Sequence, residues 1–265
     1  PFRIDNTPPT LTLLGENPMN ISYGELFEDP GYEVTDNLDV DIKNKVIIEG
    51  EVHTKKIGSY NLLYSVEDGA GNKATATRTV NVIDEEQPVI TLKGDNPLIL
   101  EVGTPYEELG AIAEDNADGD ISQQIKIDGE VDSTKLGTYE IYYNVVDRSG
   151  NEAEEVIRTV KVVDSTPPDL ILIGDQEVTI ELGETYEEQG FRAIDNYDGD
   201  ITDRVQISNH VNLQQVGTYE IIYTVEDTSG NVATIVRTVQ VIDTTEPTNE
   251  KLLEKDPTLP KTATY

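Results

Sequence analysis

The chain has 265 residues, and its 52 acidic and 19 basic side chains give a formal net charge of −33. This charge argues strongly against nucleic-acid binding, because phosphate contacts need clustered Lys and Arg, and equally against docking on an anionic membrane. The absence of Cys excludes disulfides, thiol nucleophiles and thiolate metal sites. No apolar run approaches the roughly 18 residues of a spanning helix, so we expect no membrane insertion. The chain begins at Pro1 without Met or a signal peptide, so we expect it to be part of a longer precursor.

One sequence unit occurs three times. Residues 115–121 read Asp-Asn-Ala-Asp-Gly-Asp-Ile, and the phrase returns at 195–201 and, with Val40 in place of Gly, at 36–42. Such a repeat at a fixed period of about 80 residues indicates tandem copies of one structural unit. The predicted domains are 1–83, 84–163 and 164–243, followed by a polar, Pro-containing linker at 244–265.

Within a unit, the apolar residues follow strand periodicity. In chain order, the middle unit has short β-type runs at 89–92, 98–102, 111–113 and 125–127. From Tyr139 onward, alternate residues are apolar, which is typical of a half-buried strand.

A turn and a final strand complete each unit. Asp147-x-x-Gly150-Asn151 predicts a hairpin turn in which Gly takes a positive φ and Asp bonds the local backbone. The strand after it contains Arg158 in an Arg-Thr-Val segment. Six or seven short strands in about 80 residues predict a β-sandwich.

A Gly-x-Tyr segment precedes the penultimate strand and ends at Tyr60, Tyr139 and Tyr219. It fits a tyrosine corner, in which the phenol hydroxyl bonds upstream backbone. The position two residues later, a Cys in antibody domains, is Ile141 in the middle unit. We therefore expect a core held by packing alone.

The Arg of each Arg-Thr-Val segment, at Arg78, Arg158 and Arg237, shares strand parity with apolar neighbours. Two interpretations stay open. These side chains lie at the rim of the sandwich and pair with an Asp, or they are exposed on the strand.

Taken together, Tyr-Glu-Glu-x-Gly, Asp-Asn-x-Asp-Gly-Asp-Ile, Gly-Thr-Tyr, Asp-x-x-Gly-Asn and Arg-Thr-Val resemble a bacterial Ig-like surface-repeat family. That family occurs in tandem in Gram-positive surface proteins and beside catalytic domains of secreted enzymes, and a related domain occurs in an insecticidal crystal toxin. The resemblance covers residues 5–243, and the first copy departs from it at Val40. It implies an all-β chain of three tandem Ig-like β-sandwich domains in an elongated array, acting as an extracellular, non-catalytic spacer or adhesive module.

Acidic residues gather in two loops of each unit, which an Ig-like topology places at the same end as the incoming linker. Ca²⁺ takes six to eight oxygen ligands, so these loops and the linker predict calcium sites at the domain junctions, which would stiffen the array. The alternative, that the phrase is turn chemistry in which Asp and Asn bond their own backbone, stays open. The candidate ligands are Asp84, Asp115, Asn116, Asp118, Asp120 and Asp147 for one junction, and Asp164, Asp195, Asn196, Asp198, Asp200 and Asp227 for the next. The set preceding the first copy is Asp5, Asp36, Asp39, Asp41 and Asp68.

The C-terminal segment resembles the sortase sorting signal Leu-Pro-x-Thr-Gly, with Ala in the fifth place. Its residues are Leu259, Pro260, Lys261, Thr262 and Ala263. Sortase would cut after Thr262 and join its carbonyl to a peptidoglycan amine, so the resemblance implies attachment to the cell wall.

We find no catalytic constellation, and the two histidines, His53 and His210, occupy non-equivalent repeat positions. We therefore expect a non-enzymatic stalk on a Gram-positive surface. Two alternatives stay open, an adhesin that binds a host protein or glycan, and the accessory region of a secreted enzyme or toxin.

Overall fold

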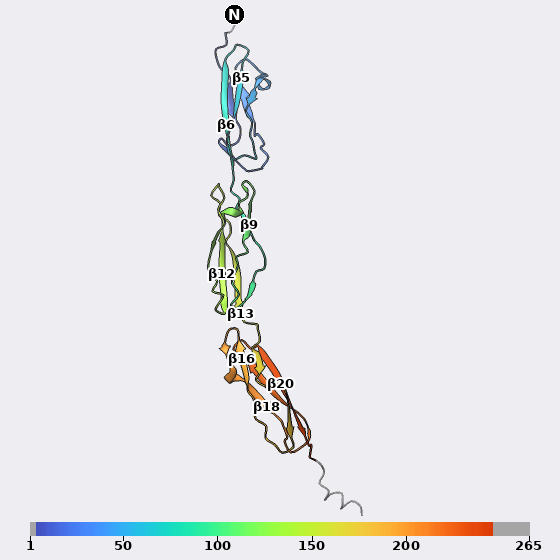
Figure 1. Ribbon diagram of the computed structural model, residues 1–265. Helices are drawn as coiled ribbons and strands as arrows, with labels where there is room; N and C mark the ends of the chain where they lie inside the picture. Colours follow the sequence, from blue (N-terminus) through green and yellow to red (C-terminus); the bar gives the residue numbers. More distant parts are fainter. Residues whose placement is uncertain (1–3, 246–265) are drawn as a thin grey trace, which may run out of the picture. The chain divides into compact units, whose positions relative to one another are not determined.

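The computed structural model describes residues 4–245 (Figure 1). Within that range the chain consists of strands and three short 3₁₀ helices, η1 (Ile42–Lys45), η2 (Ser122–Gln124) and η3 (Thr202–Arg204), and it contains no α-helix. The all-β fold is thus confirmed. The 3₁₀ turns were not predicted. η2 and η3 directly follow the Asp-rich phrase, and η1 begins at its last residue, Ile42. The Ile that ends each phrase is buried in the core.

The first repeat has six strands in two sheets. They are β1 (Thr10–Leu13), β2 (Met19–Ser22), β3 (Tyr32–Thr35), β4 (Ile47–Glu49), β5 (Gly58–Glu67) and β6 (Lys73–Ile83). One sheet pairs β1 with β3, and the other has the order β2-β6-β5-β4. β2 runs parallel to β6, and the other pairs are antiparallel.

The middle repeat has seven strands. They are β7 (Val89–Leu92), β8 (Leu98–Glu101), β9 (Ala111–Asp115), β10 (Gly119–Asp120), β11 (Lys126–Asp128), β12 (Gly137–Asn144) and β13 (Val156–Val163). Its sheets have the orders β10-β9-β7 and β11-β12-β13-β8. The four runs predicted before residue 130 are all strands, with ends that differ by no more than two residues.

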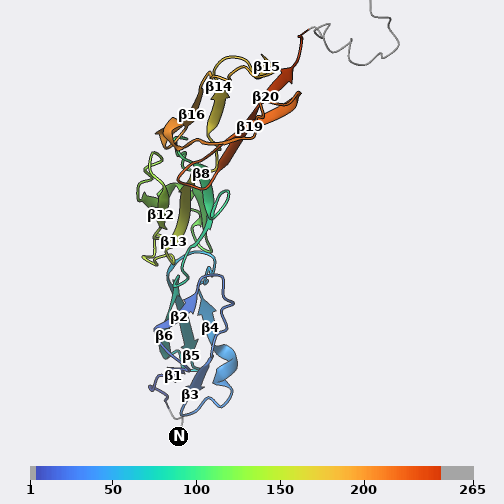
Figure 2. The ribbon, with the colours of Figure 1, turned by 90° about the horizontal axis from the view of Figure 1, so that it is seen from below.

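The third repeat also has seven strands (Figure 2). They are β14 (Asp169–Leu172), β15 (Glu177–Glu181), β16 (Phe191–Asp195), β17 (Gly199–Asp200), β18 (Gln206–Asn209), β19 (Gly217–Glu226) and β20 (Val232–Ile242). Its sheets have the orders β14-β16-β17 and β15-β20-β19-β18. The last strands of the three repeats end at Ile83, Val163 and Ile242, next to the expected domain boundaries.

The late hairpin is regular in two repeats and open in the middle one. β5–β6 and β19–β20 pair along their full length. In the middle repeat β12 stops at Asn144, and only an isolated bridge between Val146 and Glu152 continues the ladder. This copy has one extra residue after Asn151. Side chains alternate between the two faces of a strand with a period of two residues. A single inserted residue therefore interrupts the pairing between the two strands of the hairpin.

The core forms as the alternation predicts. Tyr143 and Ile141 of β12 are buried, as are their equivalents in the other repeats. The tyrosine corner is present at Tyr60, whose hydroxyl donates to the Lys56 carbonyl at 2.7 Å, and at Tyr219, which reaches the Gln215 carbonyl at 2.9 Å.

The Arg of the last strand is fully buried, so the interpretation as an exposed strand residue is wrong. Arg158 is 0% exposed and donates to the Tyr143 hydroxyl at 3.0 Å and to the backbone oxygens of Lys93 and Asp95 at 2.6 and 2.7 Å. A charged group can be buried when such acceptors replace water.

The sequence predicted an Asp as the ionic partner of this Arg. The first repeat has such a partner, and the third repeat has a Glu in its place. Arg78 lies 3.3 Å from an oxygen of Asp29, as the rim interpretation proposed, whereas Arg237 pairs with Glu188 at 2.5 Å.

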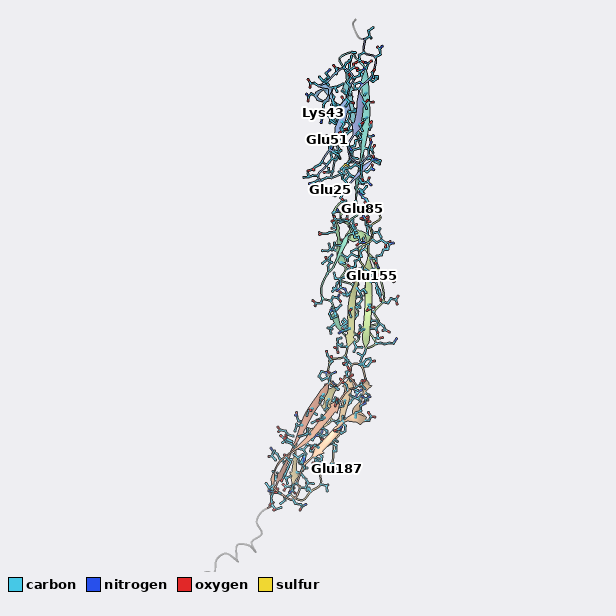
Figure 3. All side chains as sticks on the ribbon, turned by 180° about the vertical axis from the view of Figure 1, so that it is seen from behind. Glu25, Lys43, Glu51, Glu85, Glu155 and Glu187 are labelled. Carbon is cyan, nitrogen blue, oxygen red and sulfur yellow. The ribbon has the colours of Figure 1, made fainter. Side chains whose placement is uncertain are left out.

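By packing, the described chain forms two compact units. The first contains the chain up to Leu98, with Tyr106–Asp132 and Thr138–Lys161; the second contains Ile99–Pro105, Ser133–Gly137 and Val162 onward. Charged side chains such as Glu25, Glu155 and Glu187 project outward in each repeat (Figure 3). Among the described residues, no helix has the length and apolar character needed to cross a membrane.

Candidate metal centre

Three carboxylates meet at one end of the middle repeat. Asp84 directly follows β6 in the linker, Asp115 ends β9, and Asp147 begins the hairpin turn after β12. The three side chains are only 8, 9 and 7% exposed. Each offers a carboxylate oxygen, and these oxygens lie within 4.8 Å of one another. We call this set the middle triad.

One oxygen of Asp115 organises its own loop. Its Oδ1 accepts hydrogen bonds from the backbone amides of Ala117 and Asp118 at 2.9 and 2.7 Å. Gly119, at φ +72°, then reverses the chain into β10. The second oxygen, Oδ2, is buried and accepts no hydrogen bond. The turn therefore holds the carboxylate in place and leaves one oxygen without a donor.

Asn151 links the other two members of the middle triad. Its side-chain Nδ2 donates to Asp147 Oδ2 at 2.7 Å and to the backbone oxygen of Asp84 at 3.2 Å. Asp147 Oδ1 accepts from the Asn151 amide at 2.8 Å, which closes the predicted turn over Gly150. Asp84 Oδ2 is buried without a hydrogen-bond donor.

The third repeat builds the same arrangement from Asp164, Asp195 and Asp227, which we call the third triad. All three side chains are buried, and their oxygens again lie within 4.8 Å of one another. Asn231 joins Asp227 to the backbone oxygen of Asp164, at 2.8 and 3.2 Å. Both carboxylate oxygens of Asp164 and the Oδ2 of Asp195 are buried without a hydrogen-bond donor.

The first repeat has a looser version, the first triad, made of Asp5, Asp36 and Asp68. Its oxygens meet the same 4.8 Å limit, but Asp5 and Asp36 are only partly buried. Desolvation raises the pKa of Asp68, but hydrogen bonds from Asn72 and the turn amides outweigh it and leave the pKa below its usual value. Asp68 is therefore held as a carboxylate.

The structure does not bring the remaining predicted ligands into the triads. Asp118 and Asp198 occupy equivalent positions in the middle and third repeats. The Asp118 carboxylate accepts a hydrogen bond from the backbone amide of Arg148, and the Asp198 carboxylate accepts one from that of Thr228, both at 2.8 Å. Their equivalent in the first repeat, Asp39, has a lowered pKa, mainly because the Gly69 amide and then Lys45 donate to it.

The other four behave as turn or surface residues. Asp120 and Asp200 accept bonds from the residues two positions later, Ser122 and Thr202. Asn116 is exposed. Asn196 lies 3.3 Å from Glu101, in the same compact unit. Turn chemistry thus accounts for Asp120 and Asp200, whereas Asp115 and Asp195 bond their own turns and also lie within the triads.

Sequence reasoning missed two supporting groups. One is the Asn that ends Asp-x-x-Gly-Asn, which the sequence placed in the hairpin turn without its bond to the linker Asp. The other is Glu101 at the end of β8, which accepts from Ser165 and from the Thr166 hydroxyl. The pKa of Glu101 is lowered to about 2, chiefly because the Ser165 hydroxyl donates to it. Desolvation raises this pKa, but the Thr166 hydroxyl and the other donors lower it further. Glu181 has the same role toward Thr244.

This arrangement is suited to cation binding rather than to covalent chemistry. The triads consist of hard oxygen donors alone, and no His belongs to them. Both His53 and His210 are exposed. The five residues of the predicted sorting signal lie outside the described part of the chain.

Comparison with known proteins agrees with the fold. The family model described as "Bacterial surface protein, Ig-like domain" matches residues 11–82, 90–162 and 170–241. A pesticidal crystal protein, Cry22Aa of Bacillus thuringiensis, is 32% identical over 80% of this chain and 30% of its own length. The outer cell wall protein of Brevibacillus brevis is 27% identical over 68% of this chain and 19% of its own.

The similarity extends beyond bacteria. Hyalin of Strongylocentrotus purpuratus is 28% identical over 92% of this chain and 22% of its own length. The chain spans less than a third of each of these three relatives. Three consecutive matches to one model cover most of the chain, which therefore belongs to the bacterial surface protein Ig-like domain family.

Proposed function

We propose that the chain is a non-catalytic stalk that holds another part of its protein away from a Gram-positive cell wall. The observation that carries this proposal is the recurrence of the same structural features in each repeat. The buried Arg, the Asp triad and the Asn that braces it recur three times. An enzyme active site would be expected to set one repeat apart. Membership of a surface-protein family and similarity to an outer cell wall protein support an extracellular location.

Mechanical unfolding tests the stalk directly. With the chain tethered at both ends, we expect three separate unfolding events. Each would lengthen the chain by about 80 residues at roughly 3.3–3.6 Å per residue, less the folded length of the repeat. One cooperative event for the whole chain would contradict a stalk of independent modules.

Wall attachment is the second part of the proposal. It rests on residues 259–263 and their place after the last repeat. A sortase that accepts Ala in the fifth position should cleave between Thr262 and Ala263 and join Thr262 to an added amine nucleophile, as mass spectrometry would show. Pro260→Ala should abolish the reaction. An unchanged mass for the original chain would refute this attachment.

Two alternatives have specific observations behind them. Similarity to a pesticidal crystal protein favours an accessory region beside an active domain, and the domains that flank this chain in its parent protein would decide it. The open hairpin of the middle repeat favours an adhesin. It leaves a groove of about 500 Å³ whose lining includes Lys126, Asn144, Val146 and Glu152. A host glycan or matrix protein that binds the chain but not its Val146→Asp variant would support the adhesin.

One exposed apolar position recurs in every repeat. The equivalent residues Ile48, Ile127 and Ile207 are 45, 47 and 46% exposed. Their exposure is a property of the repeat itself, which fits a stalk better than a binding face on one domain.

A further inference from the structure

We propose that the middle and third triads are two Ca²⁺ sites, each complete within one repeat and its preceding linker residue. The sequence placed calcium between neighbouring domains. The structure places all three carboxylates of each triad in a single repeat and a single compact unit. The inference concerns the folded repeat, so it holds whether the chain is a stalk, an adhesin or an accessory region.

Five carboxylate oxygens of these two triads have no hydrogen-bond donor. Asp84 Oδ2 and Asp115 Oδ2 in the middle triad, and three oxygens of Asp164 and Asp195 in the third, are buried without a donor. These side chains are all more than nine-tenths buried. A buried carboxylate oxygen without a partner is strongly unfavourable, and three carboxylates so close together also repel one another. A bound cation removes both penalties.

The donor chemistry selects the cation. Carboxylate oxygens without nitrogen or sulfur ligands suit a hard cation such as Ca²⁺ or Mg²⁺. Ca²⁺ accepts variable coordination in which carboxylates are mixed with water and other oxygens. Mg²⁺ demands a near-ideal octahedron and gives up its water reluctantly. Water would complete the Ca²⁺ shell beyond the carboxylates.

The surrounding hydrogen bonds prepare the site. Backbone amides hold one oxygen of Asp115 and leave the other free, and Asn151 fixes Asp147 against the Asp84 backbone. Outer groups that orient ligands in this way raise metal affinity. The same bonds recur around the third triad. The first triad has two partly buried members, so we expect a weaker site there.

The test is calorimetric titration of the full chain, freed of metal, with CaCl₂. We expect two tight equivalents, and an affinity for MgCl₂ at least about tenfold lower. Asp115→Asn should remove one equivalent, Asp195→Asn the other, and the double variant both. Asn keeps an oxygen that can accept the turn amides and replaces the unpaired oxygen with a donor, so the turn is preserved. Asp118→Asn is the matched control, because Asp118 bonds Arg148 outside the triad, and it should keep both equivalents.

Thermal unfolding distinguishes a lost site from a lost fold. In EDTA, the double variant should melt at or above the wild-type temperature, because the unpaired oxygens and their repulsion are gone. In calcium, only the wild type should gain stability from the two sites. The proposal is overturned if the wild type binds no calcium, if the double variant still binds two equivalents, or if it is already less stable than the wild type in EDTA.

Discussion

The side chain of Asn151 donates to the backbone oxygen of Asp84 at 3.2 Å, although 67 residues separate them in sequence. The same nitrogen donates to Asp147, so one amide joins the linker to the hairpin turn. The linker is thereby fixed to the repeat that follows it. Asn72 and Asn231 form the same link in the other repeats.

Replacing this amide should weaken the middle repeat. We expect Asn151→Ala to lower the free energy of unfolding by about 1–3 kcal/mol, because it leaves buried acceptors unsatisfied. The loss should be larger in calcium than in EDTA. Urea unfolding measures both values. Asn116→Ala, at an exposed position of the neighbouring loop, is the control and should stay within about 0.5 kcal/mol. Equal losses for the two variants would contradict the role given to Asn151.

The buried Arg should matter more than any surface charge. Arg158→Met removes the donor to Tyr143 and to three backbone oxygens and leaves them buried, so we expect a loss of about 3–5 kcal/mol in urea unfolding. Arg148→Ala is the matched control. The Arg148 side chain is 84% exposed and lies 3.9 Å from Asp118, so its loss should cost no more than about 0.5 kcal/mol. Wild-type stability in Arg158→Met would show that the buried bonds contribute nothing net.

Two glycines with positive φ should respond differently to a methyl group. A Cβ on Gly129 would lie 2.4 Å from the Glu140 carbonyl oxygen, whereas one on Gly103 would meet nothing within 4 Å. Gly103→Ala therefore adds only backbone strain, about 1–2 kcal/mol. Gly129→Ala adds a clash with backbone that cannot rotate away, so it should cost clearly more. Thermal melts of both variants provide the comparison, and an equal shift would mean that the clash relaxes.

The Glu101 contact predicts a pH dependence. Folding lowers the pKa of Glu101 from 4.5 to about 2, chiefly through the Ser165 hydroxyl. Its stabilising contribution is therefore complete above about pH 4.5 and is lost as the pH falls toward 2. Wild type and Glu101→Gln should differ in melting temperature at neutral pH and converge in acid. A difference that stays constant as the pH is lowered would contradict this assignment.

Much of the fold follows from local pattern. The alternation from Tyr139 onward predicted the buried strand, and β7 has the predicted bounds, because period-two patterning and turn residues act over a few positions. The convergence of Asp84, Asp115 and Asp147 also followed, because an Ig-like topology brings those three segments to one end.

Other features depend on contacts that the sequence does not display. Asp115 and Asp118 belong to one phrase, yet only the first enters the triad, because the turn directs the second toward Arg148. The burial of Arg158 depends on carbonyls more than 60 residues away. Strand parity grouped Arg158 with apolar neighbours but left a rim position and an exposed position open, because it could not supply those acceptors.

The most direct measurement is a crystal structure of the chain grown in calcium, with anomalous scattering from a lanthanide exchanged into the crystal. We expect a strong peak among Asp84, Asp115 and Asp147 and another among Asp164, Asp195 and Asp227. The calcium–oxygen distances should be about 2.3–2.6 Å. Triads that hold only water at saturating calcium would contradict the proposed calcium sites.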